Sequence, residues 1–190
     1  MRTLIIIFFV NISFTVCSFS QFFWTEQVTG VIVSLTSVSN INGMNAWVCG
    51  NSGTVIRTTN GGYNWTNHSG NGIPANVSLV NIFGINNTTA IVSGYIGSNT
   101  FVYRTTNSGT NWQQVFTQTN GFINAVWMTS ATNGFMEGDP VGGRWSLWKT
   151  TNGGANWDST GLYLPQSGSE AGWNNSMWLN YPEIWFGTNN

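Results

Sequence analysis

The most constraining feature of the sequence is a short motif that occurs three times with almost the same letters. The copies are Thr58-Thr-Asn-Gly-Gly-Tyr-Asn-Trp65, Thr105-Thr-Asn-Ser-Gly-Thr-Asn-Trp112 and Thr150-Thr-Asn-Gly-Gly-Ala-Asn-Trp157. The tryptophans that end the copies are separated by roughly 45 residues, a period typical of stacked supersecondary units. The chain is therefore expected to repeat one structural unit rather than to build a single irregular core.

The pattern between these motifs predicts β-strands. Short runs of β-branched and aromatic residues alternate with clusters of Gly, Asn and Ser, and no helical periodicity is visible after the N-terminal segment. Each repeat resolves into four expected strands. They are residues 31–39, 46–49, 54–58 and from 64 onward in the first repeat, 77–85, 90–93, 101–105 and 111–116 in the second, and 122–129, 134–137, 145–150 and 156–162 in the third.

Incomplete units flank the three repeats. Residues 24–28 resemble the fourth strand of the second repeat, whereas residues 173–179 and 184–187 resemble the first two strands of a further unit. Four antiparallel strands in about 45 residues match one blade of a β-propeller, which closes with about four to eight blades. We therefore predict an all-β, incomplete (truncated) propeller with three full four-stranded antiparallel blades. The alternative is a four-bladed ring in which the N-terminal strand joins the last pair.

The expected domain boundaries follow from this division. They are a signal peptide at 1–20, a single strand at 21–30, blades at 31–70, 71–118 and 119–165, and a partial blade at 166–190.

The N-terminus has the layout of a secretory signal peptide. Arg2 precedes an apolar run at 4–10, and Ser18 and Ser20 stand at the −3 and −1 positions of a cleavage before Gln21. The run is too short to span a bilayer, and no second membrane span is expected. The prediction is a protein that is secreted, at the cell surface or periplasmic. Lipidation of Cys17 is the alternative.

Composition excludes several functions. Only 6% of residues are charged and the formal net charge is −1, so the basic surface required for nucleic-acid binding is absent. With His68 as the sole histidine and Cys49 as the only cysteine after the signal peptide, a zinc site is not expected. We predict neither a metal nor a cofactor, and we interpret Cys49 as a small buried apolar side chain.

The repeated motif has the chemistry of a tight turn. Its glycines Gly62, Gly109 and Gly154 supply a positive φ. Side chains of Thr58, Asn60, Thr105, Asn107, Thr150 and Asn152 are suited to bond the turn backbone. Trp65, Trp112 and Trp157 are expected to pack against the sheet, so the motif is interpreted as structural.

The pattern Ser/Thr-x-Asp/Asn-x-Gly-x-x-Trp resembles the Asp-box, or BNR repeat, of sialidases, sortilin-type receptors and photosystem II assembly-factor-like propellers. The resemblance covers essentially the whole chain after the signal peptide, with Asn where those families usually have Asp. It implies that the box is a folding element away from the active face.

Alternating antiparallel strands place the box turns on one edge of the blades and the loops between second and third strands on the other. Ligand-binding residues are therefore expected opposite the boxes. The candidates on this binding face are His68, Tyr95, Asp139 and Arg144.

Glu137 and Asp139 are the candidate catalytic residues. Side chains two apart on a strand share a face, within reach for paired acid and base work. The alternative is that Asp139-Pro140 simply opens a turn. The segment also resembles a Gly-Asp-Pro loop of secreted glycosidase-like propellers. Arg57 and Arg104 occupy the same repeat position as Lys149, so the arginine triad that a sialidase requires is not assembled.

Together these features predict a secreted, non-enzymatic propeller module that binds a protein or a glycan. They do not predict its oligomeric state. The alternative function is the N-terminal part of a sialidase-like or other glycoside hydrolase.

Overall fold

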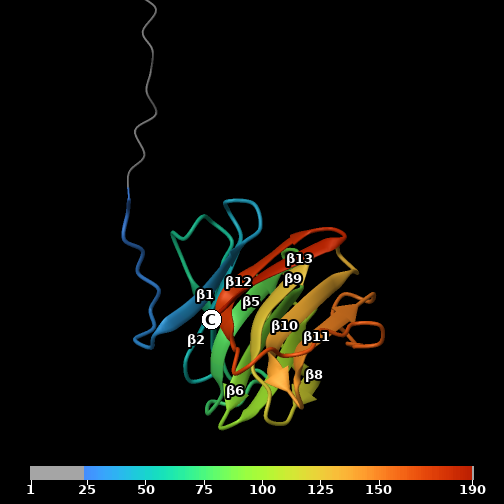
Figure 1. Ribbon diagram of the computed structural model, residues 1–190. Coiled ribbons are helices and arrows are strands. Elements are labelled where there is room, and N and C mark those ends of the chain that lie inside the picture. The colour runs from blue at the N-terminus through green and yellow to red at the C-terminus, as the bar shows by residue number, and fades with distance from the viewer. Residues whose placement is uncertain (1–23, 190) are drawn as a thin grey trace, which may run out of the picture.

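The computed structural model describes residues 24–189, which form thirteen β-strands and no helix (Figure 1). The strands are β1 (Leu35–Asn40), β2 (Ala46–Gly50), β3 (Thr54–Thr58), β4 (Thr66–Asn67), β5 (Ser78–Gly84), β6 (Ala90–Ile96), β7 (Asn99–Thr105), β8 (Gln113–Gln118), β9 (Ile123–Met128), β10 (Gly134–Val141), β11 (Arg144–Thr150), β12 (Gly172–Asn180) and β13 (Glu183–Thr188). The prediction of an all-β protein is confirmed. The expected signal peptide at 1–20 lies outside the described residues.

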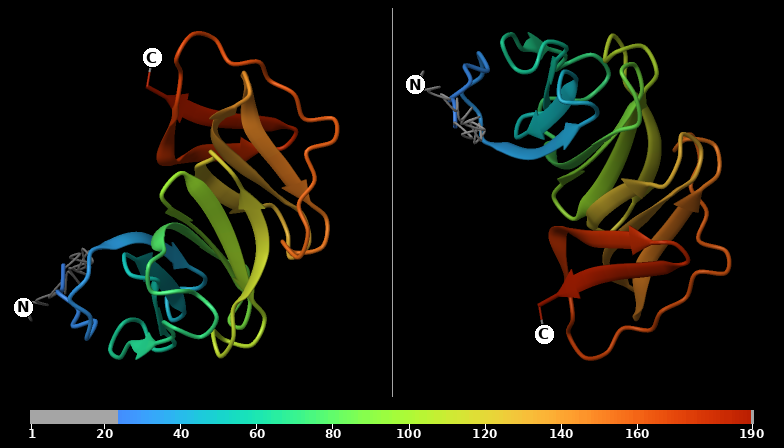
Figure 2. Two further views of the ribbon diagram at one scale, coloured as in Figure 1. Left: turned by 90° about the horizontal axis from the view of Figure 1, so that it is seen from below. Right: turned by 90° about the horizontal axis from the view of Figure 1, so that it is seen from above.

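The strands form four antiparallel sheets, which we call blades 1 to 4. Blade 1 is β1-β2-β3-β4, blade 2 is β5-β6-β7-β8, blade 3 is β9-β10-β11 and blade 4 is β12-β13. Figure 2 shows the blades following one another in sequence order, with blade 1 and blade 4 at the two ends of the series. The first strands β1, β5, β9 and β12 lie innermost, where they contact one another. The prediction of an incomplete propeller is confirmed.

Blade 3 lacks the regular fourth strand expected at 156–162. One isolated bridge, between Lys149 and Asp158, continues the sheet there, and a second, between Arg144 and Pro165, follows it along β11. The reason is local, because the Asp158 carboxylate accepts hydrogen bonds from the backbone N–H and the hydroxyl of Thr160, at 2.9 and 2.7 Å. This turn, followed by Gly161 at φ 79°, bends the chain away from the sheet.

Of the N-terminal strand expected at 21–30, the described residues 24–30 form no strand. Residues 24–29 carry no regular structure, and Trp24 and Val28 are exposed. The segment is held by the side chain of Gln27, which donates to the carbonyl of Gly61 at 3.2 Å. Because these two apolar side chains are not buried, the segment lacks a gain in free energy that offsets the entropy lost on forming a strand. Among residues 24–189, β13 pairs only with β12, so the segment does not close a four-bladed ring.

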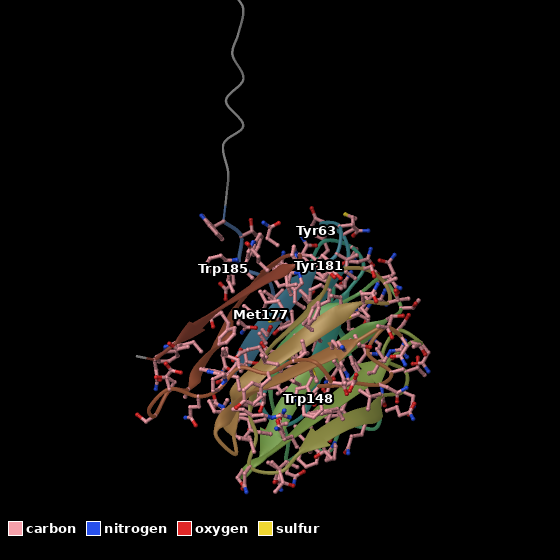
Figure 3. The ribbon with its side chains drawn as sticks, turned by 45° about the vertical axis from the view of Figure 1, so that its right-hand side comes forward. Tyr63, Trp148, Met177, Tyr181 and Trp185 are labelled. Atoms are coloured by element: carbon pink, nitrogen blue, oxygen red, sulfur yellow. The ribbon has the colours of Figure 1, made fainter. Side chains whose placement is uncertain are left out.

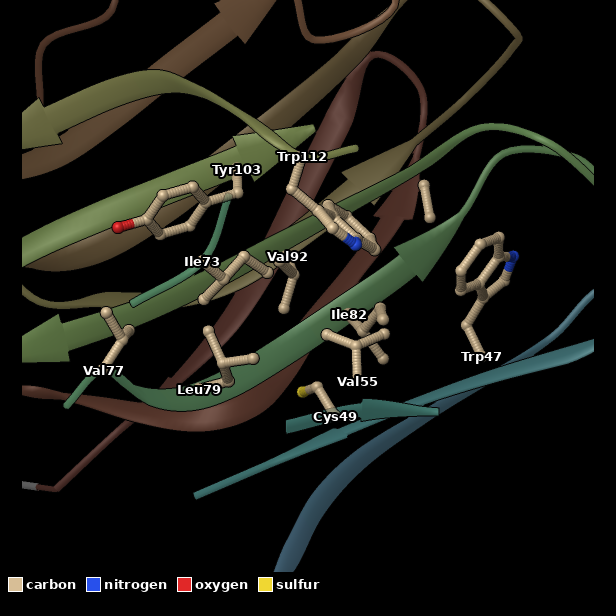
Figure 4. Close-up of a cluster of buried hydrophobic side chains, with 11 residues drawn as sticks. Trp47, Cys49, Val55, Ile73, Val77, Leu79, Ile82, Val92, Tyr103 and Trp112 are labelled. Atoms are coloured by element: carbon tan, nitrogen blue, oxygen red, sulfur yellow. The ribbon is translucent and has the colours of Figure 1, made fainter. Parts of the chain in front are cut away.

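The core lies between consecutive blades. Between blades 1 and 2, Trp47, Cys49 and Val55 face side chains of the next blade that include Leu79 and Trp112 (Figure 4). Two further clusters fill the next two interfaces. Burial raises the pKa of the Cys49 thiol to about 12, opposed by a hydrogen bond with the Thr36 side chain, in agreement with the interpretation of Cys49 as a buried apolar residue.

Blade 4 differs from blade 3 in the set of side chains that it turns towards the preceding blade. In blade 3 the residue two before the strand-ending glycine, Met136, packs towards the preceding blade. In blade 4 the equivalent residue, Trp185, is exposed, whereas Ile184 and Phe186 pack towards blade 3. A shift of one residue turns every side chain of a strand to the opposite face, and here it leaves Trp185 on the outside.

Candidate functional site

Each box is a compact hydrogen-bonded turn. In the second copy the Thr105 hydroxyl accepts from the N–H of Gly109 and donates to the side-chain oxygen of Asn107, both at 3.0 Å. That oxygen also accepts from the N–H of Asn111 at 3.0 Å. The other two copies make the same bonds at Thr58, Asn60, Gly62 and Asn64, and at Thr150, Asn152, Gly154 and Asn156. In these bonds the side chain of the third box residue, an Asn, acts only through its accepting oxygen. This explains why Asn stands where similar repeats have Asp.

The boxes also connect neighbouring blades. The Trp112 ring packs edge-on against Trp47 of blade 1, with centroids 5.9 Å apart. Arg104 of blade 2 donates from Nε to the carbonyl of Gly153 in the third box at 2.7 Å. The equivalent cation of blade 1, Arg57, lies over the Trp47 ring instead, 5.0 Å from its centroid. Trp112 and Trp157 therefore pack in the clusters between blades, whereas the sequence suggested only that they pack against the sheet.

The two edges of the blades are distinct. Each box donates a backbone hydrogen bond to the turn between the first two strands of its own blade: Gly61 to Met44, Ser108 to Thr88 and Gly153 to Thr132. On the opposite edge, the N–H of Gly53 bonds to Val77 and the N–H of Asp139 bonds to Phe122. The topology therefore separates a box edge from a loop edge, as expected from alternating antiparallel strands.

Asp139 and Glu137 lie together at the interface between blades 3 and 4. One carboxylate oxygen of Asp139 accepts from the Asn124 amide and from the N–H of Gly172 in β12, both at 2.8 Å. Asp139 and Pro140 do not open a turn. They lie within β10 at a bulge, and the turn follows at Gly142 and Gly143 with φ 64° and 81°.

Glu137 is fully buried, and neither of its carboxyl oxygens has a hydrogen-bond partner among the described residues. It occupies the strand position that Cys49 and Ser93 hold in the first two blades, and all three are fully buried. Burial raises the pKa of Glu137 to about 8, the Asp139 carboxylate adds to the shift, and the Asn124 amide opposes it. Glu137 lines a mostly apolar cavity of about 140 Å³ between the blades. The pair is therefore engaged in the blade interface rather than presented to solvent.

The four residues expected on the binding face are not brought to one place. Tyr95 packs on Phe122 with ring centroids 5.2 Å apart, next to Asp139 on the loop edge. Arg144 begins β11 at the tip of the β10–β11 hairpin. His68 lies elsewhere, with its ring 6.1 Å from Trp47 and against Gly109 of the second box.

The position of His68 is therefore a correction to the binding-face prediction. The N–H of His68 still donates to the carbonyl of Val55 in β3 at 2.8 Å, so His68 lies beside the sheet of blade 1 with its ring against the second box. Desolvation and the nearby charge of Arg57 lower the pKa of His68, opposed by a hydrogen bond with the Gly109 backbone.

A groove of about 410 Å³ runs along the innermost strands. Its lining comes from all four blades: Ser37, Val38, Ser39, Asn40, Ile82, Phe83, Gly84, Ala125, Val126, Trp127, Asn175 and Met177. None of these side chains is ionisable. Across the groove, the Ser37 hydroxyl lies 3.5 Å from the side-chain oxygen of Asn175, so β1 and β12 approach each other. We call this surface the inner groove.

An aromatic row runs along the inner groove. Phe83 of β5 contacts Trp127 of β9 at 5.9 Å between ring centroids, and Trp127 contacts Trp178 of β12 at 5.2 Å. Trp178 is 60% exposed, so the row opens to solvent at blade 4. Aromatic faces next to Ser and Asn side chains are suited to bind a chain with apolar groups and uncharged polar groups.

Neither a metal site nor a membrane-spanning helix is present in the described part of the chain. Residues 24–189 contain no cluster of three or more His, Cys, Asp or Glu side chains that would hold a metal ion. They also contain no helix long and apolar enough to cross a membrane.

Comparison with protein-family models identifies the family of this chain. The model of the photosynthesis system II assembly factor YCF48 matches residues 25–134, more than half of the chain. The chain belongs to the YCF48 family. Comparison with curated proteins finds no match.

One solved structure supports the fold. YCF48 bound to D1 peptide matches with a TM-score of 0.58 and 15% identity over 83% of this chain and 55% of that chain. YCF48 from Cyanidioschyzon merolae matches with a TM-score of 0.47 and 23% identity over 66% of this chain and 36% of that chain. An ancestral GH74 enzyme matches with a TM-score of 0.47 and 21% identity over 69% of this chain and 19% of that chain. The chain spans about half the length of the first of these proteins.

The inner groove of this YCF48-family chain was not found from the sequence. Its signal was present, because Ser39, Phe83 and Trp127 stand at the same position of three successive first strands, opposite Trp47, Ile91 and Phe135. That these positions line a groove depends on how the blades are arranged around the inner strands.

Proposed function

We propose that this YCF48-family chain is a non-enzymatic protein-binding propeller module that binds an extended, uncharged peptide segment in the inner groove. The observation that carries the proposal is the lining of the groove, which combines the aromatic row with serine and asparagine side chains and contains no ionisable group. A charged ligand would lose hydration without gaining a partner there.

The comparison with YCF48 supports a peptide as the ligand class. A YCF48 structure of similar fold is described as bound to D1 peptide. A peptide offers alternating apolar side chains and backbone amides, and the groove offers Phe83 and Trp127 next to Ser39 and Asn175. A glycan also stacks on aromatic rings, so it is the competing ligand in the test.

The test introduces a charge into the groove. Val38 is 67% exposed and Asn175 is exposed with φ 59°, a conformation that Asp tolerates. Linear peptides selected from a displayed library on the full chain should bind Val38→Asp and Asn175→Asp at least tenfold more weakly. Val28→Asp, at an 87% exposed position outside the groove, is the matched control and should bind normally.

Two results contradict the proposal. Equal binding of the selected peptides to all variants would place their site elsewhere. Amide chemical-shift changes along β1, β5 and β9 on addition of cello-oligosaccharides or sialyllactose, without any for peptides, would indicate a glycan site.

We also propose that the protein is secreted, at the cell surface or periplasmic. The support is the charged, apolar and small-residue layout of residues 1–20. Mass spectrometry of the protein recovered outside the cytoplasm should give an N-terminus at Gln21. A protein that retains Met1 would contradict this localisation.

A further inference from the structure

The third box shows how a box is held between two blades. The N–H of Gly153 donates to Thr132, in the turn between the first two strands of its own blade, at 2.7 Å. Its carbonyl accepts from Arg104, on the third strand of the preceding blade, at 2.7 Å. One glycine therefore binds a turn of its own blade and a cation of the blade before it.

An apolar residue of the preceding blade forms the other contact. On the second strand of each blade, the residue three positions before the glycine is Trp47 in blade 1 (before Gly50) and Ile91 in blade 2 (before Gly94). Trp47 packs against the box residue Trp112. Ile91 lies so close to Gly154 that a Cβ there would overlap it, and it belongs to the same apolar cluster as Trp157. This strand position therefore packs against the next box.

The same three elements line an open cleft of about 580 Å³ between blades 3 and 4. Phe135 is the equivalent of Trp47 and Ile91, and Lys149 is the equivalent of Arg104. Tyr181, 76% exposed, belongs to the turn between β12 and β13 and corresponds to the turn that contains Thr132 (Figure 3). We call this surface the box cleft. Among the described residues no box occupies it.

The adjacent strand is unpaired on the matching side. In blades 1 and 2 the second strand pairs with the strand that leads into the box, as β2 with β3 and β6 with β7. The second strand of blade 4, β13, pairs only with β12 in the described part of the chain. Its free N–H and C=O groups are available to a further strand.

We propose that the box cleft and the free edge of β13 together bind a β-hairpin whose turn carries an Asp-box. The first strand of this hairpin pairs with β13, the carbonyl of its fourth box residue, the position of Gly153, accepts a hydrogen bond from Lys149, and its tryptophan packs on Phe135. The partner is thus defined by the chemistry of its turn, Ser/Thr-x-Asn/Asp-x-Gly-x-x-Trp. The inference does not depend on the inner groove, which lies on different strands.

The hairpin β7–β8 of this chain, residues 99–118, supplies a probe of known conformation. A copy is attached behind Asn190 by a flexible Gly/Ser linker, which gives an effective concentration in the mM range for a short linker. Hydrogen exchange should slow at least tenfold at the edge amides of β13, Glu183–Thr188, and the melting temperature should rise. A copy that carries the equivalent of Trp112→Ala and Asn107→Ala should give neither effect.

The receptor surface is tested with two variants. Tyr181→Ala and Lys149→Ala should each reduce the protection of β13 several-fold. Tyr63→Ala, at an exposed tyrosine of the first box, should leave the protection unchanged and serves as the control. Tyr181 is exposed, so its variant is expected to fold even if Lys149→Ala does not.

Three results would overturn the proposal. They are an attached hairpin that leaves β13 unprotected, a mutated hairpin that protects β13 as well as the original, and protection that persists in Tyr181→Ala. Loss of peptide binding in the inner groove would not bear on any of them, so the two proposals fail separately.

Discussion

Arg104 and Gly153 join two blades through one hydrogen bond, with the guanidinium Nε of blade 2 donating to the box carbonyl of blade 3 at 2.7 Å. A contact of this kind links the repeat in the sequence to the stacking of the blades. The box is therefore both a turn within one blade and a joint with the preceding one.

Removal of this bond should destabilise the protein. Arg104→Ala is expected to lower the free energy of unfolding by about 1.5–3 kcal/mol, the range for hydrogen bonds to charged groups. Arg57→Ala is the matched control, because Arg57 stacks on Trp47 instead of bonding to a box carbonyl. This stacking contributes about 0.5–1 kcal/mol. Urea denaturation of the two variants measures the difference. An equal loss in both would show that the bond to Gly153 is unimportant.

The box chemistry can be tested at its threonine. Thr105→Val keeps the shape but removes the acceptor of the Gly109 N–H, which should cost about 1–3 kcal/mol because that donor is buried. Thr105→Ser keeps the hydroxyl and should cost much less. Thermal unfolding followed by circular dichroism distinguishes the variants, and identical melting temperatures for Val and Ser would contradict the assigned role.

The Asn residues of the boxes should tolerate replacement by Asp. The side-chain oxygen of Asn107 accepts from Thr105 and Asn111, and a carboxylate accepts the same two bonds. Asn107→Asp is therefore expected to change stability by less than about 0.5 kcal/mol, whereas Asn107→Ala should cost about 1 kcal/mol for each lost bond. A strongly destabilised Asp variant would indicate that the Asn107 amide nitrogen has a partner.

Glu137 should make stability depend on pH. Its pKa in the folded state, about 8, lies above its ordinary value, so the folded state retains a proton that the unfolded state releases. The contribution of the protonated Glu137 carboxyl to the free energy of unfolding is fully present below about pH 4.5, and it is lost as pH rises through 8. Glu137→Gln should remove this dependence, measured as unfolding free energy from pH 4 to 9. If the variant showed the same pH dependence of stability as the original protein, the raised pKa of the buried Glu137 carboxyl would be contradicted.

Asp139 is expected to hold blade 4 in place rather than to act on a ligand. Its carboxylate accepts from both Asn124 and Gly172, so Asp139→Ala should cost at least about 1–3 kcal/mol and speed hydrogen exchange in β12. Peptide binding in the inner groove should persist below the melting temperature. Loss of binding with unchanged stability would instead restore Asp139 as a functional residue.

The sequence predicted the repeat, the strand types and the two edges because each depends on local pattern. Glycines that supply positive φ, side chains that bond a turn, and alternating strands are properties of a few neighbouring residues. The box bonds at Thr58, Thr105 and Thr150 are accordingly those suggested by the motif.

The errors have more than one origin. Packing between blades placed His68 against the second box, a bulge kept Asp139 and Pro140 within β10, and a local side-chain turn at Asp158 interrupted the third sheet. Each of these residues has a plausible local interpretation, but its environment is supplied by residues 30 or more positions away or by a choice between competing hydrogen bonds.

By itself the sequence determined that this protein repeats an antiparallel β unit that contains a tight turn rich in Asn and Gly, because turn chemistry and strand periodicity are local. Only the tertiary structure decided what those units present to a partner. Placing β1, β5, β9 and β12 side by side created the inner groove, and the position of blade 4 beside blade 3 created the box cleft. Both surfaces combine side chains from different blades, and their proximity depends on the burial of apolar side chains between blades.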